Sequence, residues 1–344
     1  MSLRIGIVSF AHGHVGMYAG VIKQMDDACV VAGWDADASR GKKACEAAGA
    51  EYIGDLDALL ARDDLDAFII GSETSNHAAH VEAAARTGKP ILLQKPMALT
   101  LEDCDRICAA VEASGSPFSL AWQMRCDPQN LWMRQSVREG LIGKPTLVRR
   151  RHCLNTPGMG KAFEDSWHVK PELNRGMFMD DACHPVDWFY WMFGKPKSVS
   201  AEIATLHNPK IPDDHGVATL RWADGMIGIV ESTFTCAAAD DTTNIYGTSG
   251  TILQRWGDSP SCTPEATPNN RGLRFKKQGE KDWTVVGIAT PPAHGERIKD
   301  VARPAVDFLK GMRVPIATAA EGRVVVEIML AAYRSSAEGR RIEL

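Results

Sequence analysis

Short apolar runs recur through the first third of this chain, and segments with helical spacing separate them. The runs are Leu3–Val8, Cys29–Trp34, Ala67–Gly71, Ile91–Leu93 and Phe118–Trp122. A strand that is apolar on both sides must be covered on both faces, and such strands alternating with helices form a parallel sheet with right-handed crossovers. The sequence therefore predicts a doubly wound α/β sheet of the Rossmann class.

Helix punctuation supports this arrangement. Asp55 and Thr100 stand where they can cap the helices that follow, and Gly115 is placed to end the second of these helices. The alternation of strand and helix stops after Trp122. We therefore expect a first domain over residues 1–123 and a second domain over residues 124–344.

Composition excludes several classes of partner. The 344 residues carry 39 Lys and Arg against 43 Asp and Glu, so no basic excess is available to neutralise a nucleic-acid backbone. The longest apolar runs, such as Trp188–Phe193, are far shorter than the roughly 20 residues that span a bilayer. Ser2, Leu3 and Arg4 leave no room for a signal peptide before the first strand. We expect a cytoplasmic protein that binds neither nucleic acid nor membrane.

The cysteines and the clustered histidines indicate no metal site. The nine cysteines include no C-x-x-C pair, and their odd number argues against a closed disulfide framework, so we expect free thiols. His12 and His14 belong to the first strand-to-helix turn, and His77 and His80 to a helix start, with no third ligand beside either pair. The sequence predicts no bound metal.

The turn after the first strand is where a dinucleotide pyrophosphate would meet helix amide groups. The fingerprint G-x-G-x-x-G is degraded here: one frame places its slots on Ser9, Ala11 and His14, and another on Ala11, Gly13 and Gly16. Ser and Ala are the smallest replacements for Gly, so close approach of a cofactor survives if the turn avoids positive φ at those positions. An ordinary glycine-containing turn remains the alternative.

Asp35 ends the second strand about 20 residues beyond this turn, where a carboxylate can hydrogen-bond the adenosine ribose hydroxyls. This position favours NAD over NADP. Arg40 lies near enough in sequence to attract a 2′-phosphate, although an arginine here is often a solvated helix residue. We expect NAD as the cofactor, with NADP as the alternative, and we count Arg40 among the candidate cofactor contacts.

Lys95 stands at the carboxyl end of the apolar run Ile91–Leu93, the edge of an open α/β sheet where ligands bind. Pro96 keeps it out of the helical region. A partly desolvated lysine beside a nicotinamide could donate to a substrate hydroxyl or take part in proton transfer. A lysine that extends from a strand end into solvent is the other interpretation, and spacing alone does not choose between them.

Asp180 and His184 lie four residues apart in the second half, able to share one helix face. Pro185 indicates that this helix starts near Asp181 or bends there, which places His184 near an amino terminus, where the helix dipole keeps it available as a base. Histidine is the natural acceptor for a hydroxyl proton near neutral pH. A buried histidine bonded to an aspartate for structure alone remains equally open.

Taken together, these motifs resemble one family. Gln94-Lys95-Pro96, then Gly176 through His184 to Asp187, and Ser72 to His77 are similar to the signatures of the Gfo/Idh/MocA family of NAD(P)-dependent oxidoreductases. That family has T-P-N-x-x-H or S-E-N-x-x-H ahead of E-K-P, E-K-P after a Rossmann strand, and G-G-x-L-x-D-x-G-x-H-x-x-D in its second domain. The resemblance runs almost end to end.

The resemblance implies that Lys95, Asp180 and His184 form the catalytic set, with His184 taking or giving the hydroxyl proton while hydride passes to nicotinamide C4. It also implies a cofactor lined by the first turn and by the ends of the next strands. These residues are Phe10, Ala11, His12, Gly13, His14, Asp35, Ser72, Glu73, His77 and Gln94.

The chain departs from the family pattern in places. Gln94 replaces the glutamate before Lys95 and so removes a negative charge beside the amine. Asn174 and Arg175 replace glycines, and a cation at Arg175 would suit a substrate carboxylate or phosphate.

Three further residues are candidate substrate contacts. Trp167 and His168 fall where relatives place substrate-contacting side chains, and Arg125 follows the last strand of the first domain.

The resemblance also implies an α+β second domain with an open, mostly antiparallel sheet, which binds substrate on one face and in many members a partner subunit on the other. We therefore expect a homo-oligomer, either dimer or tetramer. The segments that fit its strands are Thr146–Leu154, Ser198–Leu206, Val217–Trp222, Met226–Phe234 and Asn244–Leu253. Arg149–Arg151 alternate between faces of the first of these and are expected in solvent or at an interface. A polar loop is expected at 260–271.

The predicted function is hydride transfer between NAD(P) and a hydroxyl carbon of a sugar, sugar acid, polyol or cyclitol. Two alternatives share the scaffold: an NAD-dependent glycosidase that oxidises its substrate transiently, and a cofactor-binding regulator without catalysis. The imperfect glycine turn and Gln94 suggest the regulator, whereas Lys95, Asp180 and His184 together speak against it.

Overall fold

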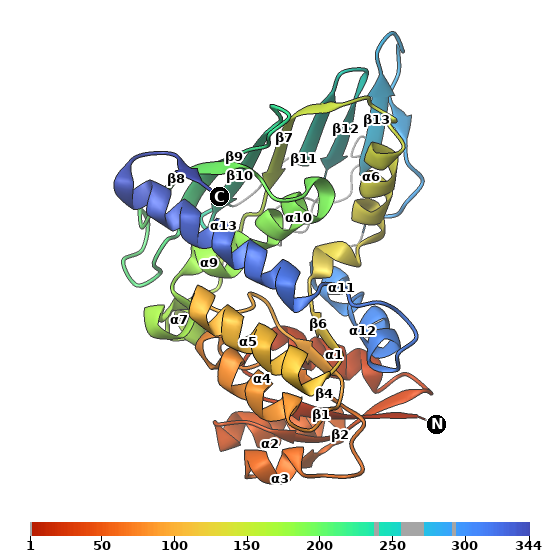
Figure 1. The fold of residues 1–344 in the computed structure, drawn as a ribbon, viewed down its shortest axis with the longest axis vertical. Helices are drawn as coiled ribbons and strands as arrows, with labels where there is room; N and C mark the ends of the chain where they lie inside the picture. Colours follow the sequence, from red (N-terminus) through yellow and green to blue (C-terminus); the bar gives the residue numbers. More distant parts are fainter. Residues whose placement is uncertain (1, 237–240, 256–271, 291–293) are drawn as a thin grey trace. The chain divides into compact units, whose positions relative to one another are not determined.

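The computed structural model describes residues 2–236, 241–255, 272–290 and 294–344 (Figure 1). The chain divides into two compact units. Unit 1 consists of Met1–Gln123 and Ile298–Val326, and unit 2 of Met124–Arg297 and Glu327–Leu344. The loop expected at 260–271 lies outside the described residues.

Unit 1 contains a six-stranded sheet in the order β3-β2-β1-β4-β5-β6, and every neighbouring pair is parallel. The strands are β1 Leu3–Val8, β2 Ala28–Trp34, β3 Glu51–Tyr52, β4 Ala67–Ile70, β5 Ile91–Leu93 and β6 Phe118–Leu120. This is the strand order of dinucleotide-binding sheets. The predicted Rossmann architecture is confirmed.

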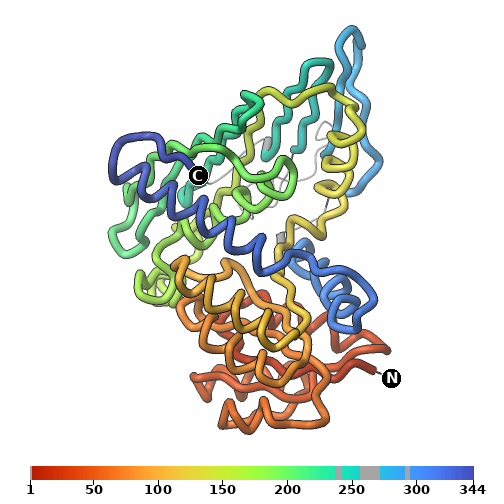
Figure 2. The backbone as a smooth tube through the Cα atoms, in the orientation of Figure 1, coloured from red at the N-terminus to blue at the C-terminus, as the bar shows by residue number. Residues whose placement is uncertain are grey.

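The helices of unit 1 begin and end where the sequence provides caps. Thr100 accepts a hydrogen bond from Asp103 N at the start of α5, and Gly115 ends this helix at a φ of 68°. Asp55 accepts one from Ala58 N at the start of α3. The helices are α1 Gly13–Ile22, α2 Ala38–Ala48, α3 Leu56–Leu60, α4 His77–Ala85 and α5 Leu101–Ser114. Helices α4 and α5 lie side by side in the orange part of the tube (Figure 2).

The chain returns to unit 1 near its end, in a segment that the sequence analysis placed in the second domain. Residues Ile298–Val326 include α12 (Ala302–Leu309) and the start of α13 (Ala319–Glu338). Leu120 N donates to Ala317 O at 2.9 Å, and Ile316 N donates to Ser119 Oγ at 2.9 Å. The returning segment thus bonds directly to β6, at the edge of the parallel sheet.

Unit 2 contains a nine-stranded sheet in the order β14-β13-β12-β11-β7-β10-β9-β8-β15. Only the β7–β10 pair is parallel among these described strands, so the sheet is mixed and mostly antiparallel, as predicted. The strands are β7 Pro145–Arg151, β8 Ser198–Ala204, β9 His215–Arg221, β10 Ile227–Thr233, β11 Asp241–Gly247, β12 Gly250–Arg255, β13 Leu273–Lys277, β14 Thr284–Val285 and β15 Ile342–Glu343.

Two expectations for this sheet are wrong in detail. The single strand expected over Asn244–Leu253 is a hairpin, because Gly247 pairs with Gly250 and the chain reverses between β11 and β12. Arg150, expected in solvent or at an interface, is fully buried. Its guanidinium lies 4.4 Å from the Trp188 ring centroid and donates to Thr243 at 2.9 Å.

Helix α10 (Cys183–Phe193) is the aromatic helix of unit 2. Trp188 and Phe189 are fully buried, and the Phe189 ring lies 5.7 Å from that of Trp222, just after β9. Its packing fixes the position of the residues at its amino end. The other helices of the unit are α6 Pro128–Arg138, α7 Lys161–Glu164, α8 Pro171–Asn174, α9 Met177–Asp181 and α11 His294–Lys299, and α13 ends here.

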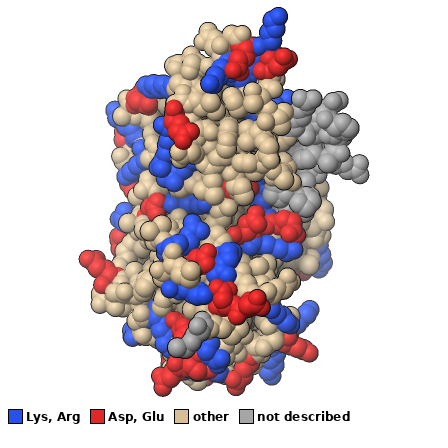
Figure 3. All heavy atoms as spheres, turned by 90° about the vertical axis from the view of Figure 1, so that its right-hand side faces the viewer, with Lys and Arg blue, Asp and Glu red and all other residues tan. Residues whose placement is uncertain are grey.

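Basic and acidic side chains are interspersed over the face in Figure 3. Among the described helices, none combines the length and apolar character needed to cross a bilayer. The eight cysteines in the described ranges are free thiols, and Cys262 lies outside those ranges.

Candidate functional site

The turn after β1 contains a non-glycine residue with a positive φ. Ser9, in the first glycine slot, lies at a φ of 67°, so the condition of a turn without positive φ is not met. A non-glycine residue in this region costs of the order of 1 kcal/mol. Ser9 Oγ offsets this cost by donating to Asp35 at 3.1 Å and by accepting from Ala11 N at 3.2 Å. The strained turn is held by the carboxylate predicted to face the cofactor.

The other turn residues lead into α1. His12 N donates to Gly71 O at 2.8 Å, and the His12 ring accepts a 3.4 Å contact from His14 N as the helix cap. Phe10 is buried, and its ring lies where a Cβ on Gly33 would stand. Gly13 is the first residue of the helix, so the amino end of α1 opens at the carboxyl edge of the sheet.

The Asp35 carboxylate is buried and heavily bonded. Oδ2 accepts from Phe10 N at 2.7 Å, and Oδ1 accepts from Asp37 N at 2.8 Å. Arg40 donates to both oxygens, at 2.9 Å from Nε and 2.7 Å from Nη2. Asp35 therefore has to release one of these donors before it can accept from a ribose hydroxyl.

Arg40 is the exposed member of this pair. Its Nη2 also lies 3.0 Å from Glu73 Oε1, which brings together three residues predicted to contact the cofactor. The Arg40 side chain is 30% exposed whereas that of Asp35 has no exposed surface. A ligand arriving at the end of β2 meets the guanidinium before the Asp35 carboxylate.

His77 connects two of the predicted cofactor segments. Its Nδ1 lies 3.0 Å from Pro96 O and 3.2 Å from Met97 O, and its Nε2 lies 3.2 Å from Ser72 O. Burial lowers the pKa of His77 to about 4, against the hydrogen bonds to these carbonyls, which raise it. His77 is fully buried, and its contacts with the Pro96 and Met97 carbonyls hold the loop after Lys95 in place. A 2.9 Å hydrogen bond between Ser72 Oγ and His80 Nδ1 also holds Ser72.

Gln94 and Lys95 directly follow the carboxyl end of β5, where the sequence places them. Both side chains are buried, and Gln94 N donates to Ile70 O at 3.0 Å, which continues the parallel ladder by one residue. The Lys95–Pro96 peptide bond is cis. The predicted lysine is therefore a buried residue at a strand end, and the interpretation of a side chain extended into solvent is wrong.

The Gln94 amide is the feature of unit 1 that best fits a bound cofactor. Neither Oε1 nor Nε2 has a hydrogen-bond partner within the described part of the chain, and both atoms are buried. A buried amide without partners costs about 1–3 kcal/mol. A carboxamide such as that of nicotinamide offers both a donor and an acceptor and would satisfy it. The residues present therefore fit a nicotinamide cofactor.

In unit 2, Asp180 pairs with His168. Asp180 lies in α9 and is buried, and its Oδ2 lies 2.6 Å from His168 Nδ1. The Trp167 ring stacks on the His168 ring with centroids 3.9 Å apart, and Asn174 Nδ2 donates to His168 O at 3.2 Å. The structure thus brings together one predicted catalytic residue and two predicted substrate contacts.

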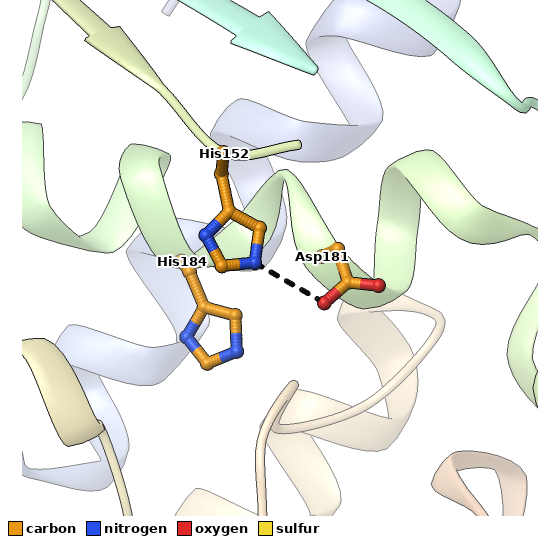
Figure 4. A group of neighbouring side chains, drawn as sticks. All are labelled: His152, Asp181 and His184. Atoms are coloured by element: carbon orange, nitrogen blue, oxygen red, sulfur yellow. Dashed lines mark hydrogen bonds and ion pairs between the residues drawn. The ribbon is translucent and has the colours of Figure 1, made fainter. Parts of the chain in front are cut away.

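His184 is the second residue of α10 and is buried. As expected from Pro185, the helix is interrupted just before it, at Ala182, which separates α9 from α10. The His184 ring centroid lies 5.1 Å from that of His152, and His152 Nε2 lies 3.3 Å from Asp181 Oδ1 (Figure 4). Sequence reasoning missed His152, and it treated Asp181 only as a helix start.

Arg125 and Asp187 form a buried ion pair. Arg125 Nε donates to Oδ2 at 3.0 Å and Nη2 donates to Oδ1 at 2.7 Å, and the two side chains are 3% and 0% exposed. Asp187 is the last residue of the signature that suggested the family. The structure places the Arg125 guanidinium on this carboxylate, and substrate contact by Arg125 stays a prediction.

Arg175 lies against Tyr333. It adopts a φ of 64°, and its guanidinium lies 5.0 Å from the Tyr333 ring centroid. The Tyr333 hydroxyl donates to Asp213 at 2.8 Å and accepts from Met179 N at 3.0 Å. Burial raises the pKa of Asp213, while the hydrogen bond from Tyr333 and the charge of Arg175 oppose that rise. Glycine takes such a positive φ without steric strain, whereas the side chain of Arg175 makes this backbone conformation strained.

These features define a protein with a dinucleotide-binding parallel sheet in one unit and a mixed sheet with histidine–carboxylate pairs in the other. Residues 3–121 match the NAD-binding Rossmann fold of the Gfo/Idh/MocA oxidoreductase family, and residues 131–253 match the C-terminal domain of the same family. The chain belongs to the Gfo/Idh/MocA family.

Individual relatives are distant. An inositol 2-dehydrogenase of Acidothermus cellulolyticus is 30% identical over 220 residues, which make up 62% of this chain and 60% of that protein. The match thus spans about three-fifths of that relative. A D-apiose dehydrogenase of Paraburkholderia graminis is 25% identical over 99% of this chain and 88% of that protein. The structure of the WlbA dehydrogenase of Bordetella pertussis in complex with NADH and UDP-GlcNAcA has the same fold, with a TM-score of 0.81, 24% identity, and coverage of 100% of this chain and 98% of that one.

Proposed function

We propose that this chain is an NAD(P)-dependent dehydrogenase or reductase that transfers a hydride between the cofactor and a hydroxyl carbon of a sugar, sugar acid, polyol or cyclitol. The observation that carries the proposal is that both units match one oxidoreductase family. The resemblance of the motifs around Lys95, Asp180 and His184 to that family's signatures supports these three residues as the catalytic set. The inositol and D-apiose dehydrogenases among its relatives support this substrate class.

The cofactor contacts in this proposal come from unit 1. The turn from Phe10 to His14, which leads into the amino end of α1, binds the pyrophosphate, and Gln94 binds the nicotinamide carboxamide. Asp35 or Arg40 faces the adenosine ribose. NAD is the proposed cofactor, and NADP is the alternative that Arg40 keeps open, because its guanidinium is the more exposed group of the pair. When bound, the nicotinamide ring accepts or gives the hydride.

The proton in this proposal moves through the side chains of the catalytic set. Lys95 donates a hydrogen bond to the substrate hydroxyl, where its positive charge stabilises the developing negative charge on oxygen. His184 accepts the hydroxyl proton during oxidation and returns it during reduction. Asp180 positions the substrate together with His168, to which it is bonded.

The experiment incubates the purified chain with NAD, and separately with NADP, against a panel of inositols, polyols, sugars and sugar acids, and follows absorbance of the reduced cofactor. We expect reduction with at least one compound of these classes. A chain that binds NAD but reduces it with none of them, and that oxidises NADH with none of the matching ketones, refutes the proposal.

Variants test the assigned residues. Lys95→Ala is expected to lower kcat/KM by about 100- to 1,000-fold, because it removes a positioned charged donor. Lys89→Ala is the matched control, since Lys89 precedes the same strand and donates to Arg62 O at 2.6 Å. If Lys95 and His184 act in one reaction, the double variant Lys95→Ala/His184→Ala should be no more than slightly worse than the more damaged single variant. Fully additive losses would contradict the proposal that Lys95 and His184 act as one unit.

A further inference from the structure

Two glutamines at the carboxyl edge of the parallel sheet in unit 1 are buried. Gln94 directly follows β5, and Gln123 is the third residue after β6, which is the neighbouring strand. These residues are 0% and 1% exposed. In both of them, the amide atoms Oε1 and Nε2 have no hydrogen-bond partner within the part of the chain that the structure describes. The proposed function uses Gln94 but gives no role to Gln123.

Buried polar side chains elsewhere along β6 are hydrogen-bonded within the chain. Ser116, just before the strand, donates from Oγ to Ala85 O at 3.1 Å. Ser119, inside the strand, accepts at Oγ from Ile316 N at 2.9 Å. A buried amide without a partner in the chain has given up its hydrogen bonds to water for nothing, and folded proteins rarely keep one without a function. Gln123 therefore has the character of a ligand-binding residue.

The backbone places Gln123 close to the residues assigned to the reaction. Ala121 N donates to Leu93 O at 2.9 Å, so the pairing of β5 with β6 continues by one residue beyond β6. Neighbouring strands of a sheet lie about 4.8 Å apart. Gln94, Lys95 and Gln123 thus follow the ends of two adjacent strands, at the edge where open parallel sheets bind their ligands.

The amide of Gln123 selects a neutral partner that both donates and accepts. Nε2 offers two protons, and Oε1 offers two lone pairs. A carboxylate could accept from Nε2 only, and its charge would lie beside the Oε1 lone pairs. An ammonium group could donate to Oε1 only. Two neighbouring hydroxyl groups satisfy both amide atoms, because one can donate to Oε1 while the other accepts from Nε2.

The nicotinamide carboxamide is the other neutral group with both functions. In the proposed function it binds Gln94, the residue that directly precedes Lys95. One glutamine amide supplies one donor and one acceptor face, so it matches one carboxamide. Lys95 binds the hydroxyl that reacts. The hydroxyls that do not react are then the partners that suit Gln123.

We propose that Gln123 is a substrate-binding residue that hydrogen-bonds non-reacting hydroxyl groups of the sugar, polyol or cyclitol. The inference rests on the proposed function and deepens it, because it requires a substrate with neutral hydroxyls near the carbon that exchanges hydride. A site built to hydrogen-bond a hydroxyl discriminates strongly against compounds that lack it, so Gln123 contributes to specificity as well as to orientation.

The first measurement needs no substrate. Gln123→Met keeps the length of the side chain but removes its donor and acceptor, and therefore removes an amide that destabilises the ligand-free chain. We expect a higher urea midpoint than for wild type, followed by circular dichroism without cofactor. A midpoint at or below the wild-type value shows that the amide is bonded within the folded chain and overturns the inference.

Gln129→Met is the matched control for stability. Gln129 is 0% exposed like Gln94, but its amide is bonded: Nε2 donates to Thr290 Oγ1 at 3.1 Å, and Oε1 accepts from Gln254 Nε2 at 2.9 Å. The same substitution there breaks hydrogen bonds and should lower the urea midpoint.

The second measurement is the steady-state oxidation, with NAD, of myo-inositol, sorbitol, D-glucose, D-xylose or D-gluconate, whichever wild type oxidises fastest. Gln123→Met should raise KM for this compound by about tenfold or more, because the bound hydroxyls lose their partner, while the dissociation constant of NAD changes by less than about threefold. Gln24→Met, at an exposed position after α1, is the control and should leave KM unchanged. A KM for Gln123→Met equal to that of wild type overturns the inference.

These measurements separate the role of Gln123 from the proposed function. A wild-type chain that fails the cofactor assay in both directions refutes the dehydrogenase, and the role of Gln123 is refuted with it. An active wild-type chain whose KM does not respond to Gln123→Met refutes the role of Gln123 alone. A rise of about tenfold in the NAD dissociation constant of this variant places the amide on the cofactor instead and also overturns the inference.

Discussion

The buried pair of Arg125 and Asp187 gives a prediction that separates structure from substrate binding. Both charges lie out of contact with water and are joined by two parallel hydrogen bonds of 2.7 Å and 3.0 Å. Removal of one partner leaves the other as a buried charge that has lost its ion pair. We therefore expect Arg125→Met and Asp187→Leu each to destabilise unit 2 by about 3–5 kcal/mol.

The double variant should behave differently from the sum of the two single variants. Arg125→Met/Asp187→Leu removes the attraction and both desolvation penalties together, so its stability should lie within a few kcal/mol of wild type, about 1–4 kcal/mol either side. Because the two single losses sum to at least about 6 kcal/mol, the coupling energy between the two positions is then at least about 2 kcal/mol. A surface pair provides the comparison: Lys161 and Asp165 are 77% and 60% exposed, so Lys161→Met should leave the stability nearly unchanged.

Urea unfolding followed by tryptophan fluorescence reports mainly on unit 2, because the tryptophans in the described ranges, apart from Trp34 and Trp122, all lie in that unit. Arg125→Met with a stability loss below about 1 kcal/mol would refute the reasoning, and so would a double variant whose loss equals the sum of the single losses. A raised KM with unchanged stability would instead assign Arg125 to the substrate.

Three further predictions concern unit 1. Burial lowers the pKa of His77 to about 4, below the unfolded value near 6.5, so the free energy of unfolding should fall by about 3 kcal/mol as the pH drops from 6.5 to 4. NMR titration of the His77 ring should give a midpoint well below pH 6. A midpoint above pH 6.5 would show that the three carbonyl contacts outweigh burial. Gly71→Ala should lower the free energy of unfolding, measured in urea, by about 1–3 kcal/mol or more, because the new Cβ would lie 2.2 Å from Val15 Cγ2. Gly20→Ala on α1 is the control and should be neutral or stabilising, because its Cβ would meet no atom within 4 Å. Equal stability of the two variants would contradict this packing. Arg40→Ala should lower the affinity for NADP relative to that for NAD by at least about tenfold, because a 2′-phosphate then loses a charged donor and faces Asp35. An unchanged ratio of the two dissociation constants would show that Arg40 does not contact the cofactor.

The parallel sheet of unit 1 could be predicted from the sequence because its strands are apolar on both faces. Five of its strands follow from such runs, while β3 was missed because it has only two residues, Glu51 and Tyr52, and neither is fully buried. In unit 2, Asn244–Leu253 has the composition of one strand, and only the pairing of Gly247 with Gly250 reveals the hairpin.

The candidate site was predictable only where its residues are close in sequence. The four-residue spacing of Asp180 and His184 suggested a shared helix, and the family motif named them. His152 precedes Asp181 by 29 residues, and no local pattern shows that β7 delivers it there. Arg125 was predicted to contact substrate because it follows the last strand of the first domain. Its ion pair with Asp187 could not be predicted, because Asp187 lies 62 residues away in the sequence.

The return of Ile298–Val326 to the edge of the parallel sheet has a consequence for biosynthesis. While the ribosome is still translating unit 2, Leu120 N has no Ala317 carbonyl to which it can donate. The edge of the sheet at β6 is therefore incomplete until Ile298–Val326 has been made. The amino-terminal sheet therefore reaches its final form only when the chain is nearly finished. A gene fragment that stops at Gln123 encodes every parallel strand yet omits the segment that completes their edge, and it should yield an aggregation-prone product.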